Sequence, residues 1–500
     1  MLDGSLVTLI LFGLFGYLFY LYLTWNYKYW WKRGVNGPKP KVISGTFPSM
    51  FSADKNIVSD MCNANKNFKE TENFVGMYTF RQPQLLILNP SSIKEVLVEK
   101  FDSFHDNDIS KNVDKEVDEV LSQSPFFSQG DLWKNSRKTI EPAFQRDTVK
   151  NSYQSVLEVC GRLVNFLEKK SQYPPINGIN TKDFVLRFTS EIISHVIYGS
   201  EAGDFEKEEA SEFHNLATYP FARSLFTNLY FLIPKSLRYR KIPFLPESTV
   251  EFLNKHIQSS IQNRKGNKDK KDFLDFLIKL EGLSSSQISS HAITFMIDGF
   301  ETTATTIAHT LLLIARNPEC QERLRSEIDA KVEADGHLSF ENLNDLPYLD
   351  MCINESLRIF PPLLYSTKVC TKDCQLVNKN DQPVLVPAGC GVVIPTYTIH
   401  HDEEYYSDPE EFKPERFSET KLKSLSDQGV FLPFGLGPRK CLGVQYANAQ
   451  VKAVIVEIVR HFNVKMNANT RTDNQIDGIS YVASLEGGIW LDFEAIKKSA

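Results

Sequence analysis

The sequence predicts a mainly α-helical protein with small β-sheets, preceded by one N-terminal transmembrane helix. Long apolar segments with helical spacing dominate the middle of the chain, strand-like runs are short and few, and an uncharged apolar run begins at residue 6. No linker-like or low-complexity tract interrupts the sequence after about residue 45. We therefore expect one large folded domain behind the membrane segment.

The N-terminal run, residues 6–25, contains no charged side chain. A helix of this length rises about 30 Å, the thickness of a bilayer core. A cleaved signal peptide is the alternative, but the run is too long for one and no basic residue precedes it. Basic residues follow the run, which predicts a cytosolic body. Five aromatic residues suit a membrane-interface belt: Trp25, Tyr27, Tyr29, Trp30 and Trp31.

These features divide the chain into an anchor at 1–27, a basic and proline-rich linker at 28–44, and a single domain at 45–500. Within the domain we expect helices over 285–316, 347–359 and 442–462. Strands are expected at 85–88, 383–389, 391–395 and 487–493. The polar stretch 412–431 is expected to be a long loop.

Charge and cysteine content exclude some classes of protein. A net charge of −6 and a pI near 6.0 argue against nucleic acid as the main partner. Eight scattered cysteines suit a reducing compartment and indicate no disulfide framework. The nearest pair, Cys370 and Cys374, lacks the further ligands of a zinc site.

The segment "FLPFGLGPRKCLG", residues 431–443, presents one cysteine among glycines and cations. A thiolate that binds a metal needs free backbone N–H groups, a helix N-terminus and little water. Cys441 precedes the expected helix 442–462, Phe434 can shield its sulfur, and Arg439 can pair with a carboxylate of a bound group. The surrounding glycines permit close backbone approach: Gly435, Gly437 and Gly443.

This segment resembles the cysteine-ligand loop of the cytochromes P-450, Phe-x-x-Gly-x-Arg-x-Cys-x-Gly, and matches it at every fixed position. The alternative is a buried structural cysteine in a glycine loop. The resemblance implies the cytochrome P-450 fold and a haem b group whose iron is bound by Cys441. It also implies that Phe434, Arg439 and Gly443 belong to the cofactor site.

Further motifs extend the resemblance. "ESLR" places Glu355 and Arg358 on one helix face, where alone they would form an ordinary surface ion pair. The family pattern joins both to Arg416 of "PERF" in a buried network that braces the cysteine loop. "WKNSR" resembles a helix whose Trp133 and Arg137 reach the haem propionates. Lys368 stands where many relatives carry arginine, so its propionate contact is a departure from the pattern.

The stretch "DGFETTATT", residues 298–306, resembles the family's [A/G]-G-x-[D/E]-T-[T/S], with Asp298 in place of the small first residue. Gly299 and the threonines predict a local opening of the helix, since threonine hydroxyls bond back to carbonyls. A kinked core helix without chemistry is the alternative. In the family, an acid and an alcohol deliver protons, and here Glu301 and Thr302 take those places.

The resemblance implies a monooxygenase that inserts one atom of O2 into a lipophilic small molecule, either a xenobiotic such as an insecticide or an endogenous lipid or steroid. Electrons come from NADPH through an NADPH-cytochrome reductase, with cytochrome b5 as a second donor. The residues of both central motifs resemble those of insect microsomal members of the drug- and toxin-metabolising branch. This resemblance implies that the protein is located in the endoplasmic reticulum membrane. The rival classes are a haem-thiolate isomerase or dehydratase acting on peroxides and a non-catalytic haem sensor.

Two surfaces complete these expectations. A cationic face near the cysteine would dock the reductase through Lys134, Lys138, Arg439 and Lys440. The family's substrate contacts correspond to apolar residues, which favours a lipophilic substrate. They are Phe126, Phe127, the stretch 221–234 with its alternative membrane contact, Phe295, Pro362 to Tyr365, and Tyr481 to Ala483.

Overall fold

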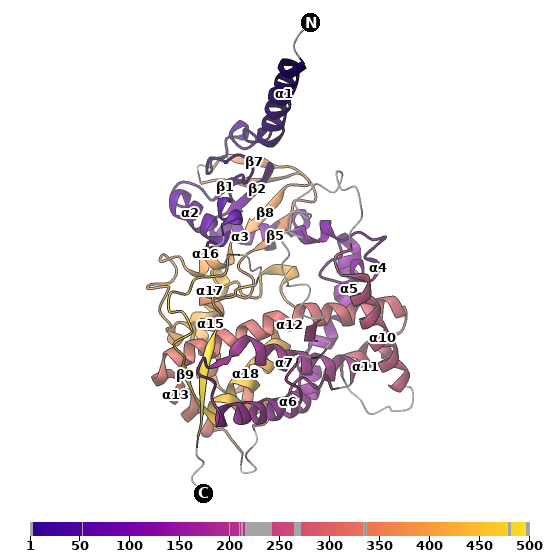
Figure 1. Ribbon diagram of the computed structural model, residues 1–500, viewed down its shortest axis with the longest axis vertical. Coiled ribbons are helices and arrows are strands. Elements are labelled where there is room, and N and C mark those ends of the chain that lie inside the picture. Colours follow the sequence, from indigo (N-terminus) through magenta and orange to yellow (C-terminus); the bar gives the residue numbers. More distant parts are fainter. Residues whose placement is uncertain are drawn as a thin grey trace.

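The computed structural model describes residues 4–52, 54–199, 201–209, 211, 214–215, 243–264, 272–333, 336, 338–379, 381–478 and 482–496. Helices form most of the body and small sheets flank them, which confirms the predicted class (Figure 1). The helices are α1 (Gly4–Thr24), α2 (Val58–Phe68), α3 (Pro90–Lys94), α4 (Glu119–Ser122), α5 (Gly130–Ile140), α6 (Arg146–Gln172), α7 (Thr181–Ile193), α10 (Glu247–Arg264), α11 (Phe273–Lys279), α12 (Ser285–Arg316), α13 (Pro318–Asp329), α14 (Phe340–Asn344), α15 (Pro347–Ile359), α16 (Thr396–His400), α17 (Glu419–Gln428) and α18 (Val444–His461).

Helix α12 crosses the interior of the body, as Figure 1 shows. It begins with a capping box, in which the Ser284 hydroxyl accepts from the Gln287 N–H and the Gln287 side chain accepts from the Ser284 N–H. It ends at Arg316, before Pro318, and this is the span that the sequence predicts. Helices α7, α15 and α18 pack around it and exclude water from almost its whole length. This helix is therefore the axis on which the site is built.

The strands form three small sheets. The largest has the order β1-β2-β8-β5-β3, in which only β2 and β8 run parallel. The others pair β4 and β9 with β10, and β6 with β7. The strands are β1 (Phe74–Thr79), β2 (Gln82–Ile87), β3 (Asp106–Asn107), β4 (Ile179–Asn180), β5 (Ser366–Val369), β6 (Cys374–Val377), β7 (Pro383–Val386), β8 (Gly391–Ile394), β9 (Phe462–Met466) and β10 (Trp490–Ala495).

The strands expected at 85–88 and 383–389 are observed as β2 and β7, with the bounds given above, and three further differences have a local cause. The last strand begins at Trp490 because Gly487 and Gly488 both adopt positive φ, which ends any extended run before it. The last long helix begins at Val444, since Gly443 is its N-cap residue. The expected loop 412–431 contains α17, which ends at Gly429 in the left-handed conformation. No residue of α17 is buried, so its sequence carries little apolar periodicity.

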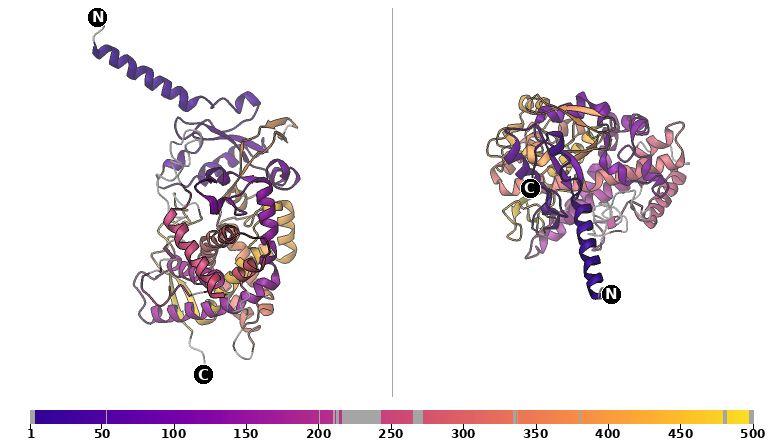
Figure 2. Two further views of the ribbon diagram at one scale, coloured as in Figure 1. Left: turned by 90° about the vertical axis from the view of Figure 1, so that its right-hand side faces the viewer. Right: turned by 90° about the horizontal axis from the view of Figure 1, so that it is seen from above.

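Helix α1 projects from the body in Figures 1 and 2, and its span Ser5–Thr24 is long and apolar enough to cross a membrane. Trp25 and Trp31 are exposed, but Trp30 is buried, so assigning Trp30 to an interface belt was wrong. Its ring fills the space above Gly76, where an added Cβ would lie 2.3 Å from the indole. The Trp30 Nε1 also donates to the Met77 carbonyl at 3.3 Å. The chain leaving α1 is thus held against β1.

Candidate active site

The cysteine loop is a tight turn whose shape depends on glycine. Gly437 has a φ of 73°, and a Cβ there would lie 2.0 Å from the Leu97 carbonyl oxygen, so no other residue fits. The Cys441 N–H donates to the Phe434 carbonyl at 2.8 Å and closes the turn. The loop therefore holds its cysteine in one position, with Phe434 half-buried at its base.

The Cys441 sulfur borders a space inside the protein. The residue is accessible to water-sized molecules, yet protein surrounds it closely enough that burial raises its pKa to about 11. The Gly443 N–H hydrogen-bonds the sulfur and opposes this shift in pKa. Helix α18 begins three residues further on, with its N-terminus near the sulfur. A thiol in this setting becomes a thiolate when a cation binds it.

Helix α12 opens onto the same space. From Ser289 to Ala315 every residue is buried except Asp298, Gly299 and Thr302, which share one helical face. Asp298 and Cys441 interact electrostatically, which places both around one internal space. The Thr302 hydroxyl donates to the Asp298 carbonyl at 2.6 Å, and the helix continues through this point. The expected hydrogen bond from a threonine hydroxyl to a carbonyl is present, but it does not open the helix. The prediction of a local opening was therefore wrong.

Glu301 and Thr302 point to different partners. The Glu301 side chain is buried, and its Oε1 lies 2.7 Å from the Lys182 Nζ on α7. No hydrogen bond joins Glu301 to Thr302, although the structure describes both residues. The sequence placed acid and alcohol next to each other, but it gave no signal that Lys182 holds the acid.

Three cations cluster beside the cysteine loop. Burial, with Arg439 and Arg137 nearby, lowers the pKa of Lys368 to about 7, although Asp106 acts in the opposite direction. Burial and Arg137 likewise lower the pKa of Arg439, again against Asp106. Arg137 also interacts with the Cys441 sulfur. Lys368 and Arg439 share one aspartate and Arg137 lies beside them, so the cluster forms a site for added negative charge.

Arg439 has hydrogen-bonding groups to spare. Its guanidinium lies 4.4 Å from the centre of the Trp133 ring, and its Nη2 donates to the Ser128 carbonyl at 2.8 Å. Its Nε and Nη1 are buried without a hydrogen-bond partner among the described residues. The Lys368 Nζ, by contrast, donates to the Asn107 Oδ1 at 2.6 Å. The orphaned donors of Arg439 suit a carboxylate, and Lys368 already has a neutral partner.

These groups fit a haem that carries two propionates. An accessible sulfur in an enclosed space supplies an iron ligand, and orphaned guanidinium donors supply partners for carboxylates. Cys441, Arg137, Arg439 and Trp133 would hold the group.

Glu355, Arg358 and Arg416 form the ion-pair network expected from the motifs. Arg358 binds both Glu355 oxygens, at 2.7 and 2.9 Å, and Arg416 Nε lies 3.2 Å from Oε1. Both Glu355 and Arg358 are completely buried. The Lys413 N–H also donates to Oε1 at 3.0 Å, so the network ties α15 to the segment before α17.

His400 links this network to the cysteine loop, and sequence reasoning missed it. Arg358 Nη1 donates to the His400 carbonyl at 2.9 Å, and the His400 Nε2 accepts from the Leu432 N–H at 2.9 Å. Because Nε2 accepts, Nδ1 carries the proton and donates to the Arg358 carbonyl at 3.1 Å. Burial lowers the pKa of His400 and keeps the ring neutral. Its place in "IHHDEE" gave no signal of this role.

The expected substrate contacts fall into four groups. Pro362 and Ala483 come together, since the Ala483 N–H donates to the Pro362 carbonyl at 3.0 Å. Phe126 is half-buried and packs edge-on against Phe127. Phe295 packs among three other rings of the core, and its ring also lies beside the open position at Gly299. Residues 221–234 and Tyr481 lie outside the described part of the chain.

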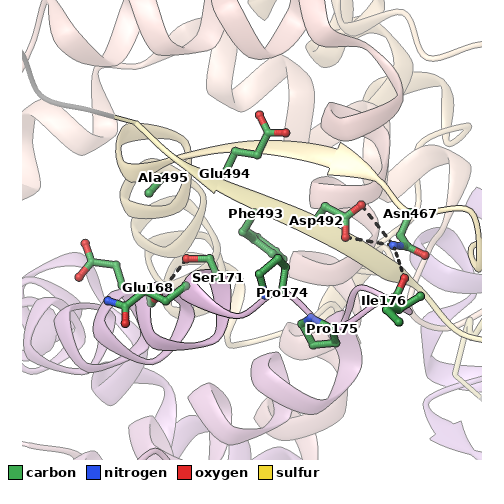
Figure 3. Close-up of a pocket in the computed structure, with 11 residues that line it drawn as sticks. Glu168, Ser171, Pro174, Pro175, Ile176, Asn467, Asp492, Phe493, Glu494 and Ala495 are labelled. Carbon is green, nitrogen blue, oxygen red and sulfur yellow. Dashed lines mark hydrogen bonds between the residues drawn. The ribbon is translucent and has the colours of Figure 1, made fainter.

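Three of the four cations expected to dock the reductase are exposed. Lys134, Lys138 and Lys440 are exposed, but the Arg439 side chain is 3% exposed and points inward. A separate hollow of about 650 Å³ lies between the end of α6 and β10 (Figure 3). None of its lining residues belongs to the site described above.

Comparison with known proteins agrees with this geometry. The family model Cytochrome P450 matches residues 35–486. "Probable cytochrome P450 28a5" of Drosophila melanogaster is 38% identical over 98% of this chain and 100% of its own length. "Probable cytochrome P450 28d1" of the same organism is 38% identical (95% and 96%), and "Probable cytochrome P450 6a13" is 29% identical (99% and 100%).

The site defines a haem-thiolate protein, and the chain belongs to the cytochrome P450 family. Members of this family bind haem through a cysteine thiolate and act as monooxygenases. The insect relatives confirm the resemblance stated from the motifs.

Proposed function

We propose that this monooxygenase inserts one atom of O2 into a lipophilic small molecule, a xenobiotic or an endogenous lipid or steroid. The observation that carries the proposal is the shared internal space between the Cys441 sulfur and the open face of α12. The open face belongs to a helix that is otherwise apolar and buried, with Ile297, Phe300 and Ala304 in the main hydrophobic core. Two of the expected substrate contacts, Pro362 and Ala483, are joined by a backbone hydrogen bond. An apolar enclosure favours a lipophilic ligand.

We assign roles to the residues of this space. Cys441 is the iron ligand, and Arg137, Arg439 and Trp133 hold the propionates, with Lys368 contributing charge. The bound haem supplies the oxygen chemistry. Thr302 presents its hydroxyl to the space, and Glu301, held by Lys182, is the acid from which a proton reaches Thr302 through water. Glu355, Arg358 and Arg416 keep the loop in place.

The partner and the location follow from the exposed features. Lys134, Lys138 and Lys440 are exposed cations, and a docking face that includes them would suit an acidic reductase carrying electrons from NADPH, or cytochrome b5. The exposed apolar helix α1 would anchor the chain in the endoplasmic reticulum membrane with the body in the cytosol. Reversing these three lysine charges should raise the reductase concentration needed for half-maximal turnover, with unchanged haem content.

The deciding experiment is a difference spectrum of the reduced, carbon-monoxide-bound protein in membranes, with Cys441→Ser beside it. A strongly red-shifted Soret band that disappears in the variant would support Cys441 as the iron ligand. A band unaffected by the substitution would contradict it. Reductase-dependent consumption of NADPH with product formation then separates a monooxygenase from a peroxide isomerase, which requires no reductase.

A further inference from the structure

Asp298 is a carboxylate that the described structure leaves without a partner. The side chain is accessible to water-sized molecules although protein surrounds it, so it faces the internal space beside Cys441. No hydrogen bond or ion pair to this carboxylate occurs within the described residues. The motif that this stretch resembles commonly has a small residue at this position, where this chain has an acid.

The nearby cations serve other groups. Lys182 pairs with Glu301, and Arg439 and Lys368 interact with Asp106. Desolvation raises the pKa of Asp298 to about 7, and no cation of the described part opposes that shift. At neutral pH this carboxyl therefore holds a proton about half of the time, and a bound cation would stabilise its ionised form.

The shape of the space indicates what kind of cation can bind. An added Cβ at Gly299, next to Asp298, would meet only the Phe295 ring, at 4.0 Å, so the helix leaves room there. A single carboxylate does not chelate a metal ion, and no cluster of metal-ligating side chains occurs among the described residues. An organic cation with an apolar body satisfies the charge, and its body suits the Phe295 ring that lies beside Gly299.

We propose that Asp298 is a substrate-recognition residue that binds the cationic nitrogen of a lipophilic amine in the space beside Cys441. The inference rests on the proposed function, because it names the substrate class of that same site. The pairing of the amine nitrogen with Asp298 also orients the substrate. The carbons next to the nitrogen would lie on the side of α12 that faces the Cys441 sulfur.

The test uses two ligands of equal shape that differ only in charge: 4-phenylbutyl-trimethylammonium and the neutral hydrocarbon in which a carbon replaces the nitrogen. A quaternary nitrogen has no lone pair, so it cannot bind the iron directly. Equilibrium dialysis against the haem-loaded full chain gives both dissociation constants. We expect the cation to bind at least about tenfold more tightly than its neutral partner.

Asp298→Asn should remove this preference and leave the affinity for the neutral ligand within about twofold. Asp298→Ala, which places the small residue of the related motif at this position, is the second variant. It should also lose the preference for the cation, and it replaces Asp298→Asn in the test if that variant misfolds. Asp329→Asn, an exposed acid on α13, is the matched control and should retain the preference.

Equal affinities in the unsubstituted protein, or a preference that survives both Asp298 variants, would overturn the proposal. Two other measurements test the proposed function independently: the carbon-monoxide spectrum and the turnover of a neutral lipophile. A protein that passes those two measurements but ignores ligand charge refutes this inference alone.

Discussion

The Glu355 carboxylate is the anion of a completely buried network, and its removal makes a sharp prediction. It receives two bonds from Arg358, one from Arg416 and one from the Lys413 N–H. In Glu355→Ala both guanidinium groups keep their charge but lose the carboxylate. Arg358 would retain only carbonyl partners, those of His400, Pro409 and Glu411.

The magnitude follows from burial. Breaking a buried ion pair by removing one partner costs about 3–5 kcal/mol, because the remaining charge stays desolvated. That is a large part of the roughly 5–15 kcal/mol by which proteins of ordinary stability are folded. The loss acts next to the segment that leads to the cysteine loop. We therefore expect Glu355→Ala to abolish haem incorporation.

The assay is haem content per milligram of membrane-expressed protein, with the thermal midpoint of unfolding measured in parallel. Glu341→Ala is the matched control, since Glu341 also forms an ion pair, with Lys150, but both side chains are about half exposed (54% and 51%). An exposed pair contributes about 0–1 kcal/mol, so the control should load haem normally. A Glu355→Ala protein with full haem content would refute the reasoning.

Three further substitutions test the site. Thr302→Ala should lower the product formed per NADPH consumed severalfold, whereas Thr306→Ala, whose hydroxyl is buried, should not; equal coupling in both contradicts the role of Thr302. Lys182→Met leaves Glu301 buried without its cation and should slow turnover at unchanged haem content, with Lys182→Arg restoring the rate. His400→Leu leaves two buried backbone groups unpaired, at about 1–3 kcal/mol each, and should weaken the red-shifted carbon-monoxide band. An unaltered band would show that His400 does not position the loop.

Local patterns in the sequence predicted the parts of the site that local physics fixes. The glycines of the cysteine loop, the bounds of α12 and the Glu355–Arg358 pair depend on residues within a few positions of one another. Each involves turn chemistry, helix capping or a shared helix face. The sequence carries those signals directly.

Contacts between distant segments carried no such signal. Lys182 reaches Glu301 across more than a hundred residues, and Trp30 fills a space created by Gly76 on another element. Trp30 lies in a run of aromatic residues that suits a membrane interface equally well, so composition could not separate the two environments. Packing in three dimensions decided both cases.

Charge is distributed unevenly around the internal space, with cations on one side and the Asp298 carboxyl on the other. Arg137, Lys368 and Arg439 lie within electrostatic reach of one another, while Asp298 feels no cation of the described residues. A cofactor with carboxylates therefore binds with those groups toward the cations and away from Asp298. A bound haem would satisfy the positive side of the space and leave the Asp298 carboxyl on α12 without a cation. In the proposed complex, the amine substrate would supply that positive charge.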